Sequence, residues 1–283
     1  MCVTKPWEHS VKLLVQENPQ SLVSFLLAGA VFEAEIGHDL KDLSLTADVF
    51  YVVKWQGRRM VLHVGFQRNR HTKLGRRLWK YNALACMQTD LPVHSVIIYL
   101  VEDTPLVQSP YVVSLPDGRS AQRLDFETIK LWEIAPEVLE QPELVGLLPL
   151  LPLTKGGQKR ETFERMMEGL EKAGKQDLFV LGYAFSSLGF VKTDDAEWLK
   201  ARFFIMHDIL KDTWVFQEIL KEGLEQGKKE DVIRCVEIRF PSLLTLAKQK
   251  MEQVASLEQL RALLDKLYQA NTIEDARIVL AGT

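Results

Sequence analysis

The chain has 283 residues, of which 47% are hydrophobic and 26% are charged, and its formal net charge is −3. A chain of this length and composition is able to bury a core of its own, in one large domain or two smaller ones. The three cysteines, Cys2, Cys86 and Cys235, are too scattered for a disulfide framework or a thiolate zinc site. Apolar runs such as residues 22–32 are too short to span a bilayer, and the N-terminus lacks a signal-peptide pattern. We therefore expect a cytoplasmic protein that does not cross a membrane.

The first 36 residues are predicted to form two helices. Residues 6–18 carry apolar side chains at helical spacing, and Pro19 interrupts the pattern. Residues 21–36 form a second, more apolar segment, and Gly37 follows as a plausible stop. Glu33 and Glu35 lie near the end of this predicted second helix.

Residues 47–67 are predicted to form a β-hairpin, and the rest of the chain is organised around it. The segment is rich in β-branched and aromatic residues on both sides of a turn at residues 56–59. Side chains alternate along a strand, so His63, Gly65 and Gln67 share one face of the second strand. The hairpin brings Asp48, at the start of the first strand, close to Gln67. Polar strand ends are usually solvated, but an acid facing an amide also resembles a functional site.

A helix and further strands follow the hairpin. Residues 72–88 are predicted to form a helix with an apolar stripe and a basic stripe. Residues 94–101 are almost wholly apolar, as in a buried central strand, and two weaker strands are expected at residues 111–115 and around 126–131. This order predicts an α/β fold with a mixed central sheet flanked by helices.

The charge distribution is uneven. Residues 49–89 contain no Asp or Glu and nine cations, although the chain as a whole is acidic. Such a local basic field is typical of a surface that binds phosphates, and a solvated basic helix face is the alternative. The cations are Lys54, Arg58, Arg59, Arg68, Arg70, Lys73, Arg76, Arg77 and Lys80.

The C-terminal half is predicted to be helical. Residues 142–153 are apolar and broken by prolines, so they are expected to pack on the core as an irregular tail. Residues 154–160 have a linker-like composition. We therefore expect a core domain at residues 1–153, a linker at 154–160 and an all-helical region at 161–283. The C-terminal helices either support a homodimer or partner docking, or form a solvated appendage.

Several segments, in order, resemble the recombination-promoting nuclease and putative transposase family of the PD-(D/E)XK nuclease superfamily. The likeness covers nearly the whole chain. It rests on Ala47-Asp48-Val49 at the start of the hairpin, on LHVGFQ at residues 62–67 and on RRLWKY at residues 76–81. Further matching segments are PVHSVIIYL, LLPLLPL, FQEILKEGLEQGKKE and the tail from RFPSL to LEQLRALLDKLYQANTIEDA.

The resemblance implies a restriction-endonuclease-like core and a metal-dependent DNA endonuclease. In such a site an acid on the first strand and the Glu of a Glu-x-Gln on the second hold Mg²⁺ or Mn²⁺, which activates water for attack on the phosphodiester. The terminal amide, which is a lysine in many relatives, helps to orient the attacking water. Asp48 matches the first acid and Gln67 matches the terminal amide, while Glu33 or Glu35 matches a helical acid that some members add as a metal ligand. The family's Arg and Tyr correspond to Arg77 and Tyr81. On this reading the nucleic-acid-binding residues are Arg68, Lys73, Arg76, Arg77, Lys80 and Tyr81.

The family's central Glu falls on Gly65, which has no metal ligand to offer. Glycine also weakens a strand interior, so its presence indicates a tolerated loss, a close approach by a ligand, or an engineered substitution. Three functions remain open. The first is a DNA endonuclease, active or weakened, the second is an inactive pseudonuclease that binds DNA or a protein, and the third is a scaffold whose basic helix contacts an acidic partner.

Overall fold

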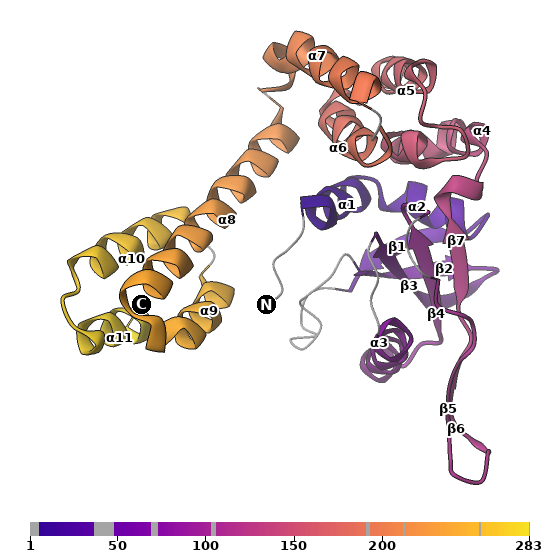
Figure 1. The fold of residues 1–283 in the computed structure, drawn as a ribbon. Coiled ribbons are helices and arrows are strands. Elements are labelled where there is room, and N and C mark those ends of the chain that lie inside the picture. The colour runs from indigo at the N-terminus through magenta and orange to yellow at the C-terminus, as the bar shows by residue number, and fades with distance from the viewer. Residues whose placement is uncertain are drawn as a thin grey trace. The chain divides into compact units, whose positions relative to one another are not determined.

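A computed structural model describes residues 6–36, 48–68, 73–102, 106–190, 193–211, 213–254 and 256–282. The fold is α/β, with a mixed five-stranded sheet, flanking helices and a helical C-terminal region (Figure 1). The chain divides into two compact units, residues 4–215 and a smaller unit formed mainly by residues 216–283. No helix in the described ranges is long and apolar enough to cross a membrane.

The central sheet has the strand order β1-β2-β3-β4-β7. Strands β1, β2 and β3 pair antiparallel, whereas β3, β4 and β7 pair parallel. The turn between β2 and β3 consists of Gln56 and Gly57, whose φ angles of 48° and 78° suit a tight two-residue hairpin. The strands are β1 (Val31–Glu35), β2 (Asp48–Trp55), β3 (Arg58–Gln67), β4 (Val93–Tyr99) and β7 (Glu127–Lys130).

Helices cover both faces of this sheet. Tyr51 of β2 donates a hydrogen bond from its hydroxyl to the carbonyl of Val15 in α1 (Pro6–Glu17), 2.9 Å away, so α1 lies on one face. On the other face, Leu78 of α3 (Leu74–Thr89) packs with Ile97 and Tyr99 of β4. Because residues alternate along a strand, Asp48, His63, Gly65 and Gln67 all lie on the α3 face.

The predicted helix over residues 21–36 is wrong in its second half. Helix α2 (Pro19–Leu26) ends early, Gly29 adopts a left-handed φ of 75°, and β1 follows. The backbone amide of Phe32 donates to Gln20 Oε1 at 2.8 Å, and β1 adds to the sheet beside β2. Pairing at this sheet edge outweighs the helical pattern of the segment.

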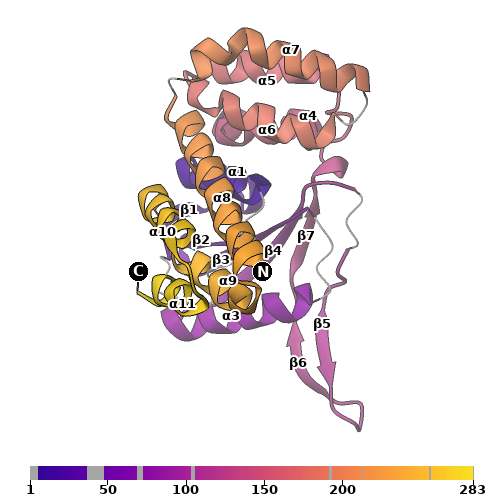
Figure 2. The same ribbon diagram turned by 60° about the vertical axis from the view of Figure 1, so that its left-hand side comes forward.

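A separate two-stranded ribbon connects β4 to β7. It consists of β5 (Tyr111–Ser114) and β6 (Ser120–Leu124), which pair antiparallel. The sequence analysis predicted β5, but it assigned no strand to β6, whose five residues include only the two apolar residues Ala121 and Leu124. Figures 1 and 2 both show the ribbon projecting past α3.

The segment predicted to be a linker is a compact part of the larger unit. Thr154 is buried and donates from its hydroxyl to the carbonyl of Leu151, and Lys155 donates from its amide to the carbonyl of Ile134. The apolar segment before it forms a buried 3₁₀ helix, η2 (Pro142–Leu153), against which α5 (Arg160–Lys172) and α6 (Phe179–Gly189) pack. The structure thus divides the chain at residues 215 and 216 and not at 154–160. The remaining elements of this unit are η1 (Leu131–Glu133), α4 (Pro136–Leu139), η3 (Gln176–Leu178) and α7 (Thr193–Leu210).

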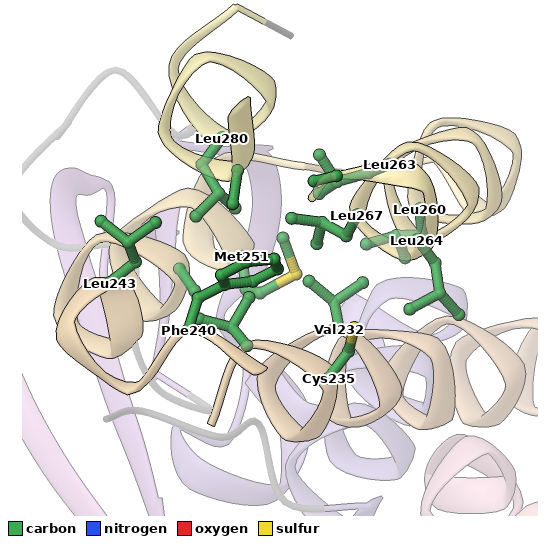
Figure 3. Close-up of a cluster of buried hydrophobic side chains, with 14 of the residues drawn as sticks. Val232, Cys235, Phe240, Leu243, Met251, Leu260, Leu263, Leu264, Leu267 and Leu280 are labelled. Atoms are coloured by element: carbon green, nitrogen blue, oxygen red, sulfur yellow. The ribbon is translucent and has the colours of Figure 1, made fainter. Parts of the chain in front are cut away.

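The smaller unit has its own hydrophobic core, shown in Figure 3. Val232, Met251, Leu263 and Leu280 meet there from four different helices. Arg239 donates three hydrogen bonds to the last carbonyls of one of these helices, at 2.7–2.9 Å. The helices are α8 (Trp214–Arg239), which begins at the unit boundary, η4 (Pro241–Leu243), α9 (Leu244–Gln253), α10 (Leu257–Gln269) and α11 (Ile273–Ala281).

Candidate functional site

Asp48 and Gly65 are directly opposite each other on β2 and β3. A Cβ atom placed on Gly65 would lie 2.9 Å from Asp48 Oδ1 and 3.8 Å from Leu78 Cδ2 of α3. The carboxylate of Asp48 therefore leans across the backbone of Gly65, beneath α3. Its side chain is only 3% exposed. The sequence-predicted acid and the glycine that replaces the expected second acid are thus immediate neighbours.

Arg77 supplies the positive charge next to Asp48. Its Nη2 atom lies 3.4 Å from Asp48 Oδ1, and its side chain is 11% exposed. The guanidinium also lies 6.0 Å from the centre of the Tyr81 ring, at the edge of cation–π range. Arg77 Nε is buried and makes no hydrogen bond within the described part of the chain. The carboxylate and the guanidinium therefore offset each other's charge at a position where little solvent reaches either group.

Gln67 ends β3 on the same face as Gly65. It is buried, and its backbone carbonyl accepts a hydrogen bond from the amide of Leu100 at 2.9 Å. Asp48 faces Gly65, so Gln67 is its diagonal neighbour, about 7–8 Å away between Cα atoms. The sequence analysis predicted that Asp48 lies close to Gln67. The register of the hairpin makes Gly65 the direct neighbour of Asp48 and places Gln67 diagonally across from it.

A buried polar network lies beside these residues. The Nδ1 atom of His63 lies 3.1 Å from Ser95 Oγ, and Asn82 of α3 donates to the same oxygen at 3.0 Å and to the carbonyl of Val93 at 3.1 Å. Because Ser95 Oγ accepts from Asn82, its own hydrogen is free to be donated to His63 Nδ1. The network joins α3 to β3 and β4. Sequence analysis noted the polar face at His63, but it had no signal for Ser95 or Asn82.

Burial controls the protonation of His63. It lowers the pKa of the imidazole to about 4, an effect that Asp48 partly opposes and Arg77 reinforces. The ring of Phe50 stacks on it at 4.4 Å. His63 is therefore neutral at neutral pH, and it contributes no positive charge to the site.

The two acids at residues 33 and 35 are not brought to Asp48. Glu33 pairs with Arg59 at 2.7 Å and lies beside the Val53 end of β2, four or more residues from Asp48, or roughly 13 Å or more at strand spacing. Glu35 lies opposite Tyr51 in the register of β1 and β2, on the other face of the sheet from Asp48. Burial and the charge of Glu35 both raise the pKa of Tyr51. Both acids belong to β1 and not to the predicted helix.

The described residues do not fit a two-carboxylate magnesium centre. No group of three or more His, Cys, Asp or Glu side chains suited to a metal ion occurs within the described ranges. Mg²⁺ favours negatively charged oxygen ligands, and here the carboxylate of Asp48 is paired with Arg77 while Gly65 offers none.

The basic residues separate into an exposed group and a buried one. Lys73, Arg76 and Lys80 are exposed on the outer side of α3, which contains no acidic residue. Arg68 is partly buried directly after β3. Tyr81 is buried against Phe50 and the other residues of a small core cluster, apart from the exposed cations of α3. Arg77 likewise faces the site and not the solvent. Arg70 lies outside the described residues.

Comparison of this chain with protein-family models, curated proteins and solved structures finds no match. The family resemblance described above therefore rests on the sequence motifs alone.

Proposed function

We propose that this protein binds DNA through the exposed basic stripe of α3 and is a weakened or inactive relative of the PD-(D/E)XK nucleases. The observation that carries the proposal is the position of Asp48, directly opposite Gly65 and next to Arg77. These are the positions at which the resemblance implies a first acid, a second acid and a conserved arginine. They meet on one face of the sheet although they come from three different elements.

Loss of cleavage follows from the charges at this site. A nuclease of the implied type needs two carboxylates to hold a divalent cation against the scissile phosphate. Here one carboxylate is missing, and Arg77 neutralises the other. The site therefore has little attraction for a divalent cation and no second ligand to hold it.

DNA binding follows from the outer surface of α3. Lys73, Arg76 and Lys80 repeat at helical spacing and lie on one exposed stripe. No carboxylate within residues 49–89 competes for them. Phosphate contacts release condensed counterions, and this release drives binding that does not depend on a metal ion.

The test measures the affinity for a fluorescent DNA duplex by anisotropy at several salt concentrations, in EDTA. We expect binding by the unaltered protein and a steep decrease with salt. Replacement of Lys73, Arg76 and Lys80 by alanine should lower the affinity at least tenfold and reduce the salt slope by about 2.7.

The matched control replaces Lys159, Lys172 and Lys200, three exposed lysines of the same unit, by alanine. This control changes the net charge equally and should alter binding little. Absence of binding by the unaltered protein at low salt, or equal losses in both triple variants, would refute α3 as the DNA-binding surface.

A further inference from the structure

The β5–β6 ribbon is attached directly to the first turn of α3. Tyr111 of β5 packs on Gly75, where a Cβ atom would come within 2.7 Å of the Tyr111 ring. Tyr111 and Leu124 also pack against the core cluster that contains Leu74 and Leu78. Glycine in a helix costs about 1 kcal/mol relative to alanine, so the close approach explains its presence here. The base of the ribbon and the basic helix thus form one packed assembly.

The base of the ribbon is held by further bonds from the sheet. The hydroxyl of Tyr99 accepts a hydrogen bond from the amide of Val107 at 2.9 Å, and Ser109 Oγ accepts one from the amide of Phe126 at 3.0 Å. Among the described residues, the outer part of the ribbon accepts and donates no hydrogen bond of this kind to the rest of the unit. Val112, Val113 and Leu115 are exposed, although each is a large hydrophobic residue. An anchored base and an exposed tip are suited to an element that contacts a partner.

The register of the ribbon shows which face turns toward α3. Tyr111 pairs with Leu124, and Val113 pairs with Gln122. Residues two apart on a strand share a face, so Val113 and Gln122 continue the face whose base packs on α3. Figures 1 and 2 show the ribbon continuing past α3. The ribbon therefore extends outward from the N-terminal end of α3, the end to which the exposed Lys73 and Arg76 belong.

We propose that the β5–β6 ribbon enters the major groove of double-stranded DNA held on α3, with Val113 and Gln122 against the bases. This inference rests on the proposed DNA binding and adds the form of nucleic acid and the groove. The major groove admits a two-stranded β-ribbon, and its base edges offer partners for a glutamine amide and for apolar side chains at thymine methyl groups. The charged groups of the ribbon are already paired, Arg119 with Asp117 and Arg123 with Asp125, so the ribbon contributes contacts to bases more than to phosphates.

The experiment combines anisotropy with dimethyl sulfate footprinting of guanine N7, which lies in the major groove. The test variant is Val113→Ser with Gln122→Ala, and the control is Val112→Ser with Ser114→Ala, on the other face of β5. Neither variant changes the charge. The unaltered protein should bind duplex more tightly than single-stranded DNA and protect guanine N7.

We expect the test variant to weaken duplex binding at least fivefold and to lose the protection, while its salt slope and its affinity for single strands stay the same. The control should behave like the unaltered protein. Unchanged duplex binding in the test variant, while the triple α3 variant is weakened, would overturn the role of the ribbon but leave the proposed function intact. The ribbon would then be free for a protein partner. Absence of any DNA binding would overturn both proposals.

Discussion

Arg77 Nη2 lies 3.4 Å from Asp48 Oδ1, and the same carboxylate oxygen would lie 2.9 Å from a Cβ atom placed on Gly65. Asp48 thus has a cation, Arg77, on one side and a residue without a side chain, Gly65, on the other. The charge of the site is balanced without a metal ion. This relationship explains why the site needs no second carboxylate for charge balance, and it predicts what placing a carboxylate at residue 65 would do.

Gly65→Glu should make the site dependent on a divalent cation. The new Cβ atom requires the Asp48 carboxylate to move, and two buried carboxylates then repel each other unless a cation lies between them. We expect Mg²⁺ or Mn²⁺ to raise the melting temperature of the variant by several degrees, with no such effect on the unaltered protein. Plasmid nicking with Mg²⁺ should also rise.

Gly65→Gln is the matched control, because it has the same size but no charge. The double variant Gly65→Glu with Asp48→Ala should lose any gain in nicking. A folded Gly65→Glu variant whose melting temperature and nicking do not respond to either cation would contradict the assignment of residues 48 and 65 to a former metal site. Nicking by the unaltered protein that is lost in Asp48→Ala would instead indicate a retained active site.

Asp48→Asn should destabilise the larger unit, because it leaves the charge of Arg77 buried without a counter-charge. We expect a loss of about 2–3 kcal/mol in the free energy of unfolding, measured by urea denaturation of that unit. Adding Arg77→Met to Asp48→Asn should recover part of this loss. A double variant whose loss equals the sum of the two single losses would show that the two groups are not energetically coupled.

The sequence predicted the hairpin, α3 and β4 because their residue patterns are strong and local. It placed Asp48 and Gly65 on the strands where they occur, since strand alternation fixes the face of each side chain. It did not predict β1, because the pairing of Phe32 with Val53 depends on residues 21 positions apart. The site shows the same limit. The partnership of His63 with Ser95 requires the parallel register of β3 and β4, which no local pattern sets.

His63 should make the stability of the larger unit depend on pH. Its pKa is about 4 in the folded protein and about 6.5 in the unfolded chain, so the unfolded chain takes up a proton first as the pH falls. Stability should therefore decrease between pH 6.5 and pH 4, by about 3 kcal/mol in total, and this contribution should not change further below pH 4. Urea denaturation across this range measures the effect.

His63→Gln provides the comparison, because glutamine keeps a polar group beside Ser95 but does not titrate. Other groups titrate in the same range in both proteins, so the difference between the two stability curves isolates His63. The difference in the free energy of unfolding between the two proteins should grow as the pH falls from 6.5. Parallel curves for the two proteins would show that His63 is not held neutral by the fold.

Arg239 should be a main determinant of the stability of the smaller unit. Its guanidinium donates to the carbonyls of Leu267, Tyr268 and Ala270, which lie at the end of α10 and would otherwise lack helical partners. Arg239→Lys keeps the charge but loses the planar fork that reaches three carbonyls at once. We expect a loss of about 2 kcal/mol, seen as faster hydrogen exchange in α10 and α11.

Arg234→Lys on the same helix should leave exchange unchanged. Equal exchange in the Arg239→Lys variant and the unaltered protein would mean that packing of the leucines in Figure 3 holds this helix end without the cap.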